Sequence, residues 1–166
     1  MSSIVLIGFM GAGKTTVGKE LVKKGFELID TDAYIEACEK MSISDIFAQK
    51  GEDYFRQAET TAFKTLLAQD KQFVISCGGG MPLREENRKL LKKLGMVVYL
   101  RIKPETVLAR LKGDTTRPLL KVDDSGERVR TLMQQREAHY LSGADFVLDV
   151  DQKTPEELAE EIFKEF

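Results

Sequence analysis

A glycine-rich segment near the start of the chain has residue types and a spacing suited to holding phosphate groups. Residues 8–15 read GFMGAGKT, which matches the spacing G-x-x-x-x-G-K-[ST]. Glycines let successive backbone N–H groups turn toward phosphate oxygens, and a helix that starts there adds the positive end of its dipole. In this pattern Lys14 reaches the β- and γ-phosphates, and the Thr15 hydroxyl binds Mg²⁺. The segment therefore predicts a site for a nucleoside triphosphate.

Two carboxylates come after the second apolar run of the chain. Asp30 and Asp32 stand on alternate positions directly after Phe26–Ile29. Beside a phosphate-bound Mg²⁺, one carboxylate can bind the metal and the other can accept a hydroxyl proton from an acceptor molecule. Either residue alone could instead be a helix N-cap. The spacing of the pair favours the chemical interpretation but does not decide which carboxylate contacts the metal.

A run of three glycines follows the third apolar run. Gly78, Gly79 and Gly80 come directly after Phe73–Cys77. A tight turn needs only one or two glycines, so a third indicates that other groups approach the backbone closely. We therefore favour a contact with a substrate hydroxyl or carboxylate over a plain turn.

Three arginines are the cations of interest, although each taken singly is an ordinary solvated charge. Arg117 lies in a segment with little apolar periodicity, where an arginine could close on a transferred phosphate. Arg56 and Arg136 lie in predicted helices. His139 is the single histidine and is interpreted as a packed or surface residue, and Cys77 as a small buried apolar residue.

The elements that must position these residues alternate between strands and helices. Predicted strands span 4–7, 26–30, 73–77, 96–100 and 146–150. Predicted helices span 16–24, 33–40, a short stretch ending at Gly51, about 52–69, 84–94, 104–113, 127–140, and a final helix starting at Thr154, with 114–126 as a loop. Alternation of this kind predicts an α/β, doubly wound parallel sheet, in which ligands bind outside the carboxyl ends of the strands. The glycine-rich segment, the carboxylate pair and the three glycines should then converge on one crevice.

Composition narrows the class of protein. The chain has 166 residues, 42% of them hydrophobic and 31% charged, which is typical of one globular domain. A net charge of -2 argues against a nucleic-acid partner. No apolar run approaches the length of a membrane span, and no leader peptide is recognisable. Cys38 and Cys77 lack metal-ligand spacing, so we expect two free thiols and a cytoplasmic location.

Taken together, these segments resemble shikimate kinase, a small phosphate-loop kinase of the nucleoside-monophosphate-kinase type. The resemblance covers essentially the whole chain. It rests on GFMGAGKTTVG (8–18), IDTDAYIE (29–36), the residues around Arg56, CGGGMPLREENR (77–88), TTRPLL (115–120), REAHY (136–140) and ADFVLDV (144–150). Many kinases share the first segment, whereas the others in this order are far more discriminating.

The resemblance implies a reaction and the residues that carry it out. The reaction is ATP- and Mg²⁺-dependent phosphorylation of the 3-hydroxyl of shikimate to shikimate 3-phosphate, in chorismate and aromatic amino acid biosynthesis. The implied catalytic residues are Asp32 as base, Lys14 and Arg117. Shikimate would be bound by Asp32, Arg56, Gly78, Gly79, Gly80 and Arg136. ATP would be bound by Gly11, Ala12, Gly13, Lys14, Thr15, Thr16, Arg110, Arg117 and Gln152, and Mg²⁺ by Thr15 and Asp30.

The resemblance also implies an architecture. We expect one domain over residues 1–166, built on a three-layer, doubly wound sheet of five parallel strands. A helical segment at about 32–60 would bind the substrate, and a lid would span about 112–126. The partners would be small molecules, with no nucleic acid and no membrane, and the protein would be a monomer.

Two other functions stay open at this point. Gluconate kinase or a nucleotide kinase would share the first segment but phosphorylate another acceptor. A regulatory module that binds ATP without turning over a small acceptor belongs to a different class of protein. The carboxylate pair and the three glycines argue against such a module, because it has no need for an acceptor pocket.

Overall fold

A computed structural model describes residues 2–111 and 125–166 of the chain. The strands are β1 (Ser3–Ile7), β2 (Glu27–Asp30), β3 (Phe73–Ser76), β4 (Gly95–Arg101) and β5 (Phe146–Asp149). The helices are α1 (Lys14–Val22), α2 (Thr31–Glu39), α3 (Ile43–Lys50), α4 (Glu52–Leu67), the 3₁₀ turn η1 (Met81–Leu83), α5 (Glu85–Leu94), α6 (Pro104–Leu111), α7 (Ser125–Gly143) and α8 (Pro155–Glu165).

The five strands form one parallel sheet, as predicted. Their order is β2-β3-β1-β4-β5. Strand β1 lies at the centre, where Val5 is paired with Ile75 of β3 and with Val97 of β4. All five residues of β1 are buried, which explains why its sequence is continuously apolar rather than alternating. The chain connects β1 to β2 on one side and then crosses back to β4 on the other, so a switch in direction falls at β1.

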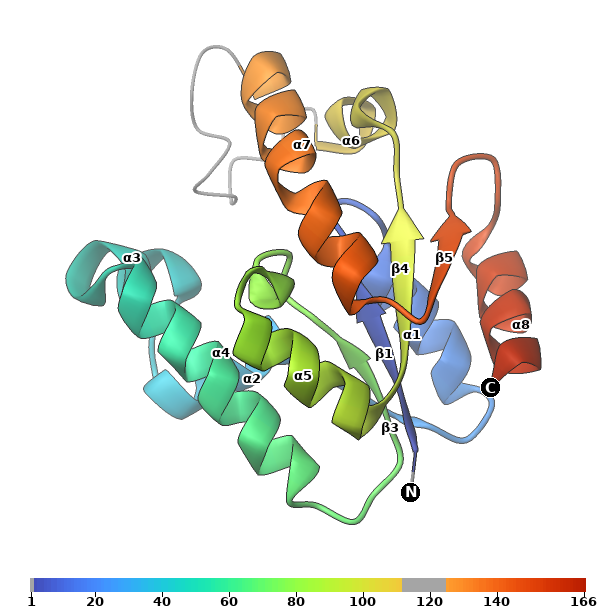
Figure 1. Cartoon of the computed structure of the whole chain (residues 1–166), viewed down its shortest axis with the longest axis horizontal. Helices are drawn as coiled ribbons and strands as arrows, with labels where there is room; N and C mark the ends of the chain where they lie inside the picture. Colours follow the sequence, from blue (N-terminus) through green and yellow to red (C-terminus); the bar gives the residue numbers. More distant parts are fainter. Residues whose placement is uncertain (1, 112–124) are drawn as a thin grey trace.

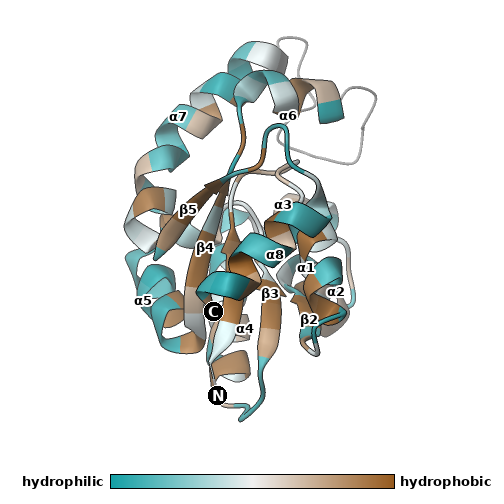
Figure 2. Ribbon diagram, turned by 90° about the vertical axis from the view of Figure 1, so that its right-hand side faces the viewer, coloured by the Kyte–Doolittle hydropathy of each residue, from teal (hydrophilic) through white to brown (hydrophobic). Residues whose placement is uncertain are grey.

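Helices cover both faces of the sheet (Figure 1). Helices α1 and α8 contact each other on one face, while α5 and α7 pack on the other. Hydrophobic residues are concentrated in the strands, and the outer sides of α5, α7 and α8 are largely hydrophilic (Figure 2). The main core joins the strands to these helices, with Phe63, Leu91 and Ile162 fully buried in it. The predicted three-layer α/β architecture is confirmed.

Helices α2 and α3, with one face of α4, form a smaller unit beside the sheet. Their own apolar cluster is built on Ile35, Ile46, Phe55 and Ala62. The predicted capping of α3 is found, because Ser42 Oγ accepts a hydrogen bond of 3.1 Å from the backbone N–H of Asp45. The segment at about 32–60, predicted to bind the substrate, falls largely within this unit.

Several element boundaries differ from those predicted. The turn η1 was not predicted, because three residues carry no periodicity. Helix α7 is longer than the predicted 127–140. Most of the predicted lid, including Arg117, lies outside the described residues. Within the described residues, no helix combines the length and apolar character needed to cross a membrane.

Candidate active site

The glycine-rich segment curls between β1 and α1 as its spacing predicted. Gly11 has φ +85° and Gly13 has φ +87°, and both angles fall in the left-handed region that favours glycine. A Cβ on Gly8 would lie 2.5 Å from the backbone oxygen of Leu100, so β4 also requires glycine there. Lys14 Nζ donates to the carbonyl oxygens of Gly8 at 2.8 Å and Phe9 at 3.0 Å. The ammonium therefore lies against the loop, at the N-terminus of α1.

Three oxygen-bearing side chains meet directly behind this loop. Thr15 Oγ1 donates to Asp30 Oδ2 at 2.8 Å and lies 3.1 Å from Ser76 Oγ. Asp30 also caps α2, because its Oδ1 accepts from the N–H of Ala33 at 3.1 Å. The metal and N-cap interpretations of Asp30 are thus compatible, since each uses a different oxygen. No group of three or more His, Cys, Asp or Glu side chains gathers as a metal site within the described part of the chain.

Asp32, in the first turn of α2, faces the glycine run. A Cβ on Gly78 would lie 2.6 Å from Asp32 Oδ1 and 3.2 Å from Glu59 Oε2. The N–H of Gly78 donates to Thr31 Oγ1 at 2.9 Å, so the start of α2 is tied to the turn after β3. The carboxylate of Asp32 therefore lies beside the glycine backbone, where it was expected.

Close approach, and not backbone conformation, explains the three glycines. Gly78, Gly79 and Gly80 are absent from the residues with positive φ in the described chain, and Gly80 has φ −93°. Charged side chains lie close to where their Cβ atoms would be, most closely at Gly78 and Gly80. A Cβ on Gly79 would lie 3.3 Å from Arg136 Nη1, and one on Gly80 would overlap the guanidinium of Arg56. The interpretation as a plain turn does not account for this.

The two arginines of the predicted acceptor site lie against this turn, and both are buried. Arg56 Nη1 donates to Glu59 Oε1 at 2.7 Å, and the guanidinium of Arg136 lies 5.7 Å from the ring centroid of Phe9. Arg56 Nε and Glu59 Oε2 are buried, and neither has a hydrogen-bond partner among the residues that the structure describes. Buried polar atoms of this kind ordinarily have partners, so these atoms mark a place where a polar ligand can bind.

Burial raises the pKa of Glu59 from 4.5 to about 7. Nearby Arg56 on α4 and Arg136 on α7 oppose this rise, and Asp32 on α2 adds to it. Because the folded protein binds the proton more tightly than the unfolded chain, folding is favoured at low pH. That stability is lost as pH rises from about 4.5 to about 7, by on the order of 3 kcal/mol.

This dependence can be measured by urea denaturation at pH 5 and pH 8. Glu59→Gln removes the titrating group, so wild type should lose more stability than this variant between the two pH values. Glu52→Gln is the matched control, since Glu52 also pairs with Arg56 but its side chain is 63% exposed. Equal losses in wild type and Glu59→Gln would contradict the assignment.

The predicted nucleotide residues surround a cavity of about 690 Å³. Its lining includes these predicted site residues: Gly11, Gly13, Lys14, Thr15, Thr16, Asp30, Asp32, Gly78, Gly79 and Arg110. Arg110 Nη1 donates to the carbonyl oxygen of Gly11 at 2.8 Å, and Pro155 also lines the cavity. Ala12 is buried in the loop. Gln152 lines a neighbouring cavity, with Lys103 and Asp151, and has φ +69°.

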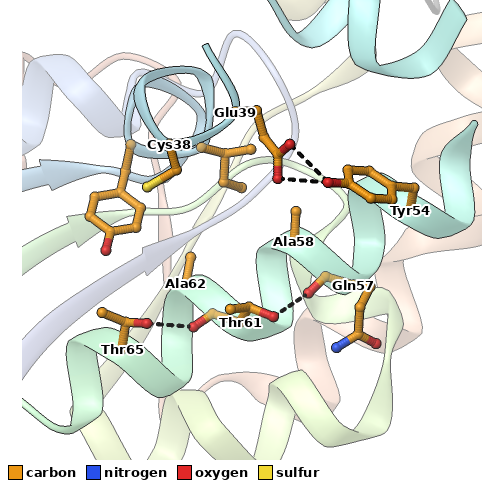
Figure 3. Close-up of a pocket in the computed structure, with 10 residues that line it drawn as sticks. Cys38, Glu39, Tyr54, Gln57, Ala58, Thr61, Ala62 and Thr65 are labelled. Carbon is orange, nitrogen blue, oxygen red and sulfur yellow. Dashed lines mark hydrogen bonds between the residues drawn. The ribbon is translucent and has the colours of Figure 1, made fainter. Parts of the chain in front are cut away.

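Another cavity lies between α2 and α4 (Figure 3) and shares no lining residue with the nucleotide cavity. Its volume is about 200 Å³, and it uses the side of α4 that carries Tyr54, Ala58 and Thr61. Tyr54 Oη donates to Glu39 Oε2 at 2.8 Å across its edge. None of the predicted site residues lines this cavity. Helix α4 therefore turns one set of side chains toward the cavity and another, including Arg56 and Glu59, toward the glycine turn.

Sequence reasoning missed residues that support the site. Glu59 could have been found, because it lies three positions after Arg56 on the same helix face. Ser76 gave no such signal, since its contact with Thr15 depends on elements far apart in the chain. Tyr140 lies in the segment 136–140, four positions after Arg136, but its contact with Gly79 could not be inferred from that spacing. His139, interpreted as a packed or surface residue, is half-buried, and its Nδ1 lies 3.2 Å from Arg88 Nη1. Cys77 is buried as predicted, and burial raises the pKa of its thiol well above 9.0.

Comparisons with known proteins identify the family of the chain. The model of the family described as shikimate kinase matches residues 10–166. A shikimate kinase of Thermodesulfovibrio yellowstonii is 48% identical over 167 residues, covering 100% of this chain and 95% of that protein. The solved structure of shikimate kinase from Acinetobacter baumannii in complex with shikimate has a TM-score of 0.93 and 36% identity, covering 99% of this chain and 92% of that one. A deoxyadenosine kinase from M. mycoides, at 20% identity and a TM-score of 0.59, shares the fold.

Proposed function

The chain belongs to the shikimate kinase family, and on that basis we propose that it transfers the γ-phosphoryl group of ATP to the 3-hydroxyl of shikimate. The observation that carries this proposal is the pair of buried arginines against Gly79 and Gly80, next to the carboxylate of Asp32 at Gly78. A guanidinium pair suits a carboxylate, and a carboxylate suits a hydroxyl that must lose a proton. The product, shikimate 3-phosphate, would serve chorismate and aromatic amino acid biosynthesis.

The acceptor would lie between α2, α4 and the glycine turn. In this arrangement Arg56 and Arg136 hold the carboxylate of shikimate, and the backbone of Gly78–Gly80 binds its ring hydroxyls. The buried Nε of Arg56 supports this placement, because a bound carboxylate would give that N–H the partner it otherwise lacks among the described residues. Asp32 would accept the proton of the 3-hydroxyl. The segment at about 32–60 would thus be the substrate-binding part of the single domain.

The donor would lie along the phosphate loop. Backbone N–H groups of residues 11–16 would bind the phosphates, and Lys14 would shift from the loop carbonyls to the β- and γ-phosphate oxygens. Arg110 would flank the adenine, with the loop that contains Gln152. Arg117, outside the described residues, would reach the phosphates from a lid at about 112–126. These assignments place the γ-phosphate opposite Asp32.

Mg²⁺ would be the metal cofactor. The grouping of Thr15, Asp30 and Ser76 oxygens fits this ion, which is commonly held by one carboxylate, a hydroxyl and substrate phosphates. When bound, Mg²⁺ neutralises charge that develops on the phosphate oxygens. Thr15 and Asp30 would hold it in place, with Ser76 fixing the Thr15 hydroxyl. We further propose a cytoplasmic monomer whose partners are small molecules.

A panel of acceptors tests the function directly. With ATP and Mg²⁺ in excess, shikimate should be phosphorylated with a kcat/KM at least 10³-fold above that for gluconate or any nucleoside monophosphate. The reason is that a site built to pair a carboxylate and several hydroxyls leaves buried charges unpaired with another acceptor. ADP release in a coupled assay gives the rates. Preference for gluconate or a nucleotide would contradict the acceptor, and ATP binding without turnover of any acceptor would favour a regulatory module.

A further inference from the structure

The last turns of α7 hold the backbone of the glycine run. Tyr140 Oη donates to the carbonyl oxygen of Gly79 at 2.7 Å. Arg136 lies four residues earlier, on the same face of α7, with Nη1 3.3 Å from where a Cβ of Gly79 would be. One helix face thus carries both a proposed ligand of the shikimate carboxylate and a fixed donor to the turn.

The ring of Tyr140 is itself held on two sides. It is buried, and its centroid lies 5.0 Å from that of Tyr99 on β4. Tyr99 Oη donates to Glu137 Oε2 at 2.5 Å, a bond that ties β4 to α7 beside the tilted ring pair. Burial raises the pKa of Tyr140 to about 12, which keeps its hydroxyl protonated and able to donate throughout the neutral range. The bond to Gly79 therefore comes from a rigid and constant donor.

This bond determines the direction of the next amide. No peptide bond in the described chain is cis, so the C=O of Gly79 and the N–H of Gly80 point in opposite directions. Because Tyr140 takes the carbonyl, the N–H of Gly80 points away from α7. Gly79 faces Arg136, and Gly80 lies against the Arg56 guanidinium. Each of the two residues that this peptide joins therefore has one guanidinium group beside it.

We propose that Tyr140 is a positioning residue for the acceptor, which directs the N–H of Gly80 at a ring hydroxyl of shikimate. The proposal rests on the proposed function, because it assigns a donor within that acceptor site. Tyr140 does not touch the substrate itself. It acts through the Gly79–Gly80 peptide, the central peptide of a turn in which the N–H of Met81 donates to the carbonyl oxygen of Gly78 at 3.1 Å. With glycine on both sides, that peptide could flip within the turn if Tyr140 did not hold its carbonyl oxygen.

The variant Tyr140→Phe removes the hydroxyl and leaves the packed ring in place. Loss of one oriented hydrogen bond should raise KM for shikimate about threefold to tenfold, with KM for ATP within about twofold of wild type. The matched control is Tyr54→Phe, which also removes a phenol hydroxyl bonded within the chain but lies at the cavity of Figure 3, away from the site. Its KM for shikimate should equal that of wild type.

Analogues of shikimate make the test specific. Calorimetry with the 4-deoxy and the 5-deoxy analogue should show that the affinity loss caused by Tyr140→Phe disappears for one of the two, because that analogue lacks the hydroxyl bound by Gly80. A loss that persists with both, or an unchanged KM for shikimate with only a lower Tm, would overturn the proposal. Failure of wild type to phosphorylate shikimate would instead overturn the proposed function, so the two failures are distinguishable.

Discussion

Asp32→Asn is expected to lower kcat for shikimate phosphorylation about 10²- to 10⁴-fold, which is the usual contribution of a general base. The amide has nearly the same size and shape as the carboxylate, so the first turn of α2 and its contact with Gly78 should persist. What disappears is the ability to accept the proton of the 3-hydroxyl. Binding of ATP should be unaffected, since the loop before α1 and the Thr15–Asp30 pair are not altered.

A coupled assay of ADP release measures this loss, and calorimetry measures the dissociation constant of ATP in the same preparation. Asp45→Asn is the matched control, because Asp45 is an exposed carboxylate in the first turn of the neighbouring helix α3. It should retain wild-type kcat. A kcat of Asp32→Asn within about threefold of wild type would exclude Asp32 as the base.

Gly80→Ala is expected to raise KM for shikimate by about 10²-fold or more. The new Cβ would overlap the guanidinium of Arg56, which must then move away from the glycine turn. A displaced guanidinium loses both charge-assisted hydrogen bonds to the shikimate carboxylate, and each is worth about 1.5–3 kcal/mol. The backbone of Gly80 has φ −93°, which alanine adopts without strain, so the effect isolates the steric displacement.

The displacement is tested by steady-state kinetics with each substrate in turn. KM for ATP should stay within about twofold of wild type, because Gly80 does not line the nucleotide cavity. Gly143→Ala provides the control. A Cβ there would lie no closer than 3.5 Å to any atom outside its chain neighbours and its own helix backbone, and Gly143, the last residue of α7, does not line the nucleotide cavity. Unchanged KM for shikimate in Gly80→Ala would mean that Arg56 does not bind the acceptor.

Most of the fold could be predicted because local patterns repeat along the chain. The continuous apolar run of β1, the caps at Ser42 and Thr154, and the glycines that end helices each depend only on neighbouring residues. Parallel pairing and the convergence of strand ends then follow from the alternation of elements. The turn η1 and the true ends of α7 escaped prediction, since they depend on packing between elements.

The residues of the candidate site likewise fall into those that the sequence could predict and those that it could not. The spacing of residues 8–15 indicated the donor loop, and the order of the remaining motifs identified the residues around the acceptor. Neither could show that Asp30 serves as an N-cap and as a partner of Thr15 with different oxygens. Those contacts join elements that meet only in the folded chain.

By itself, the sequence determined the α/β class, the phosphate loop and the residue types around the acceptor. Each of these features is defined by the spacing of residues along the chain. Only the tertiary structure decided why Gly78–Gly80 must be glycine, which carboxyl group faces Arg56, and which tyrosine holds the turn. In each case the reason is burial. Side chains from α2, α4 and α7 are brought so close to one backbone that space and desolvation, rather than local propensity, select the residue.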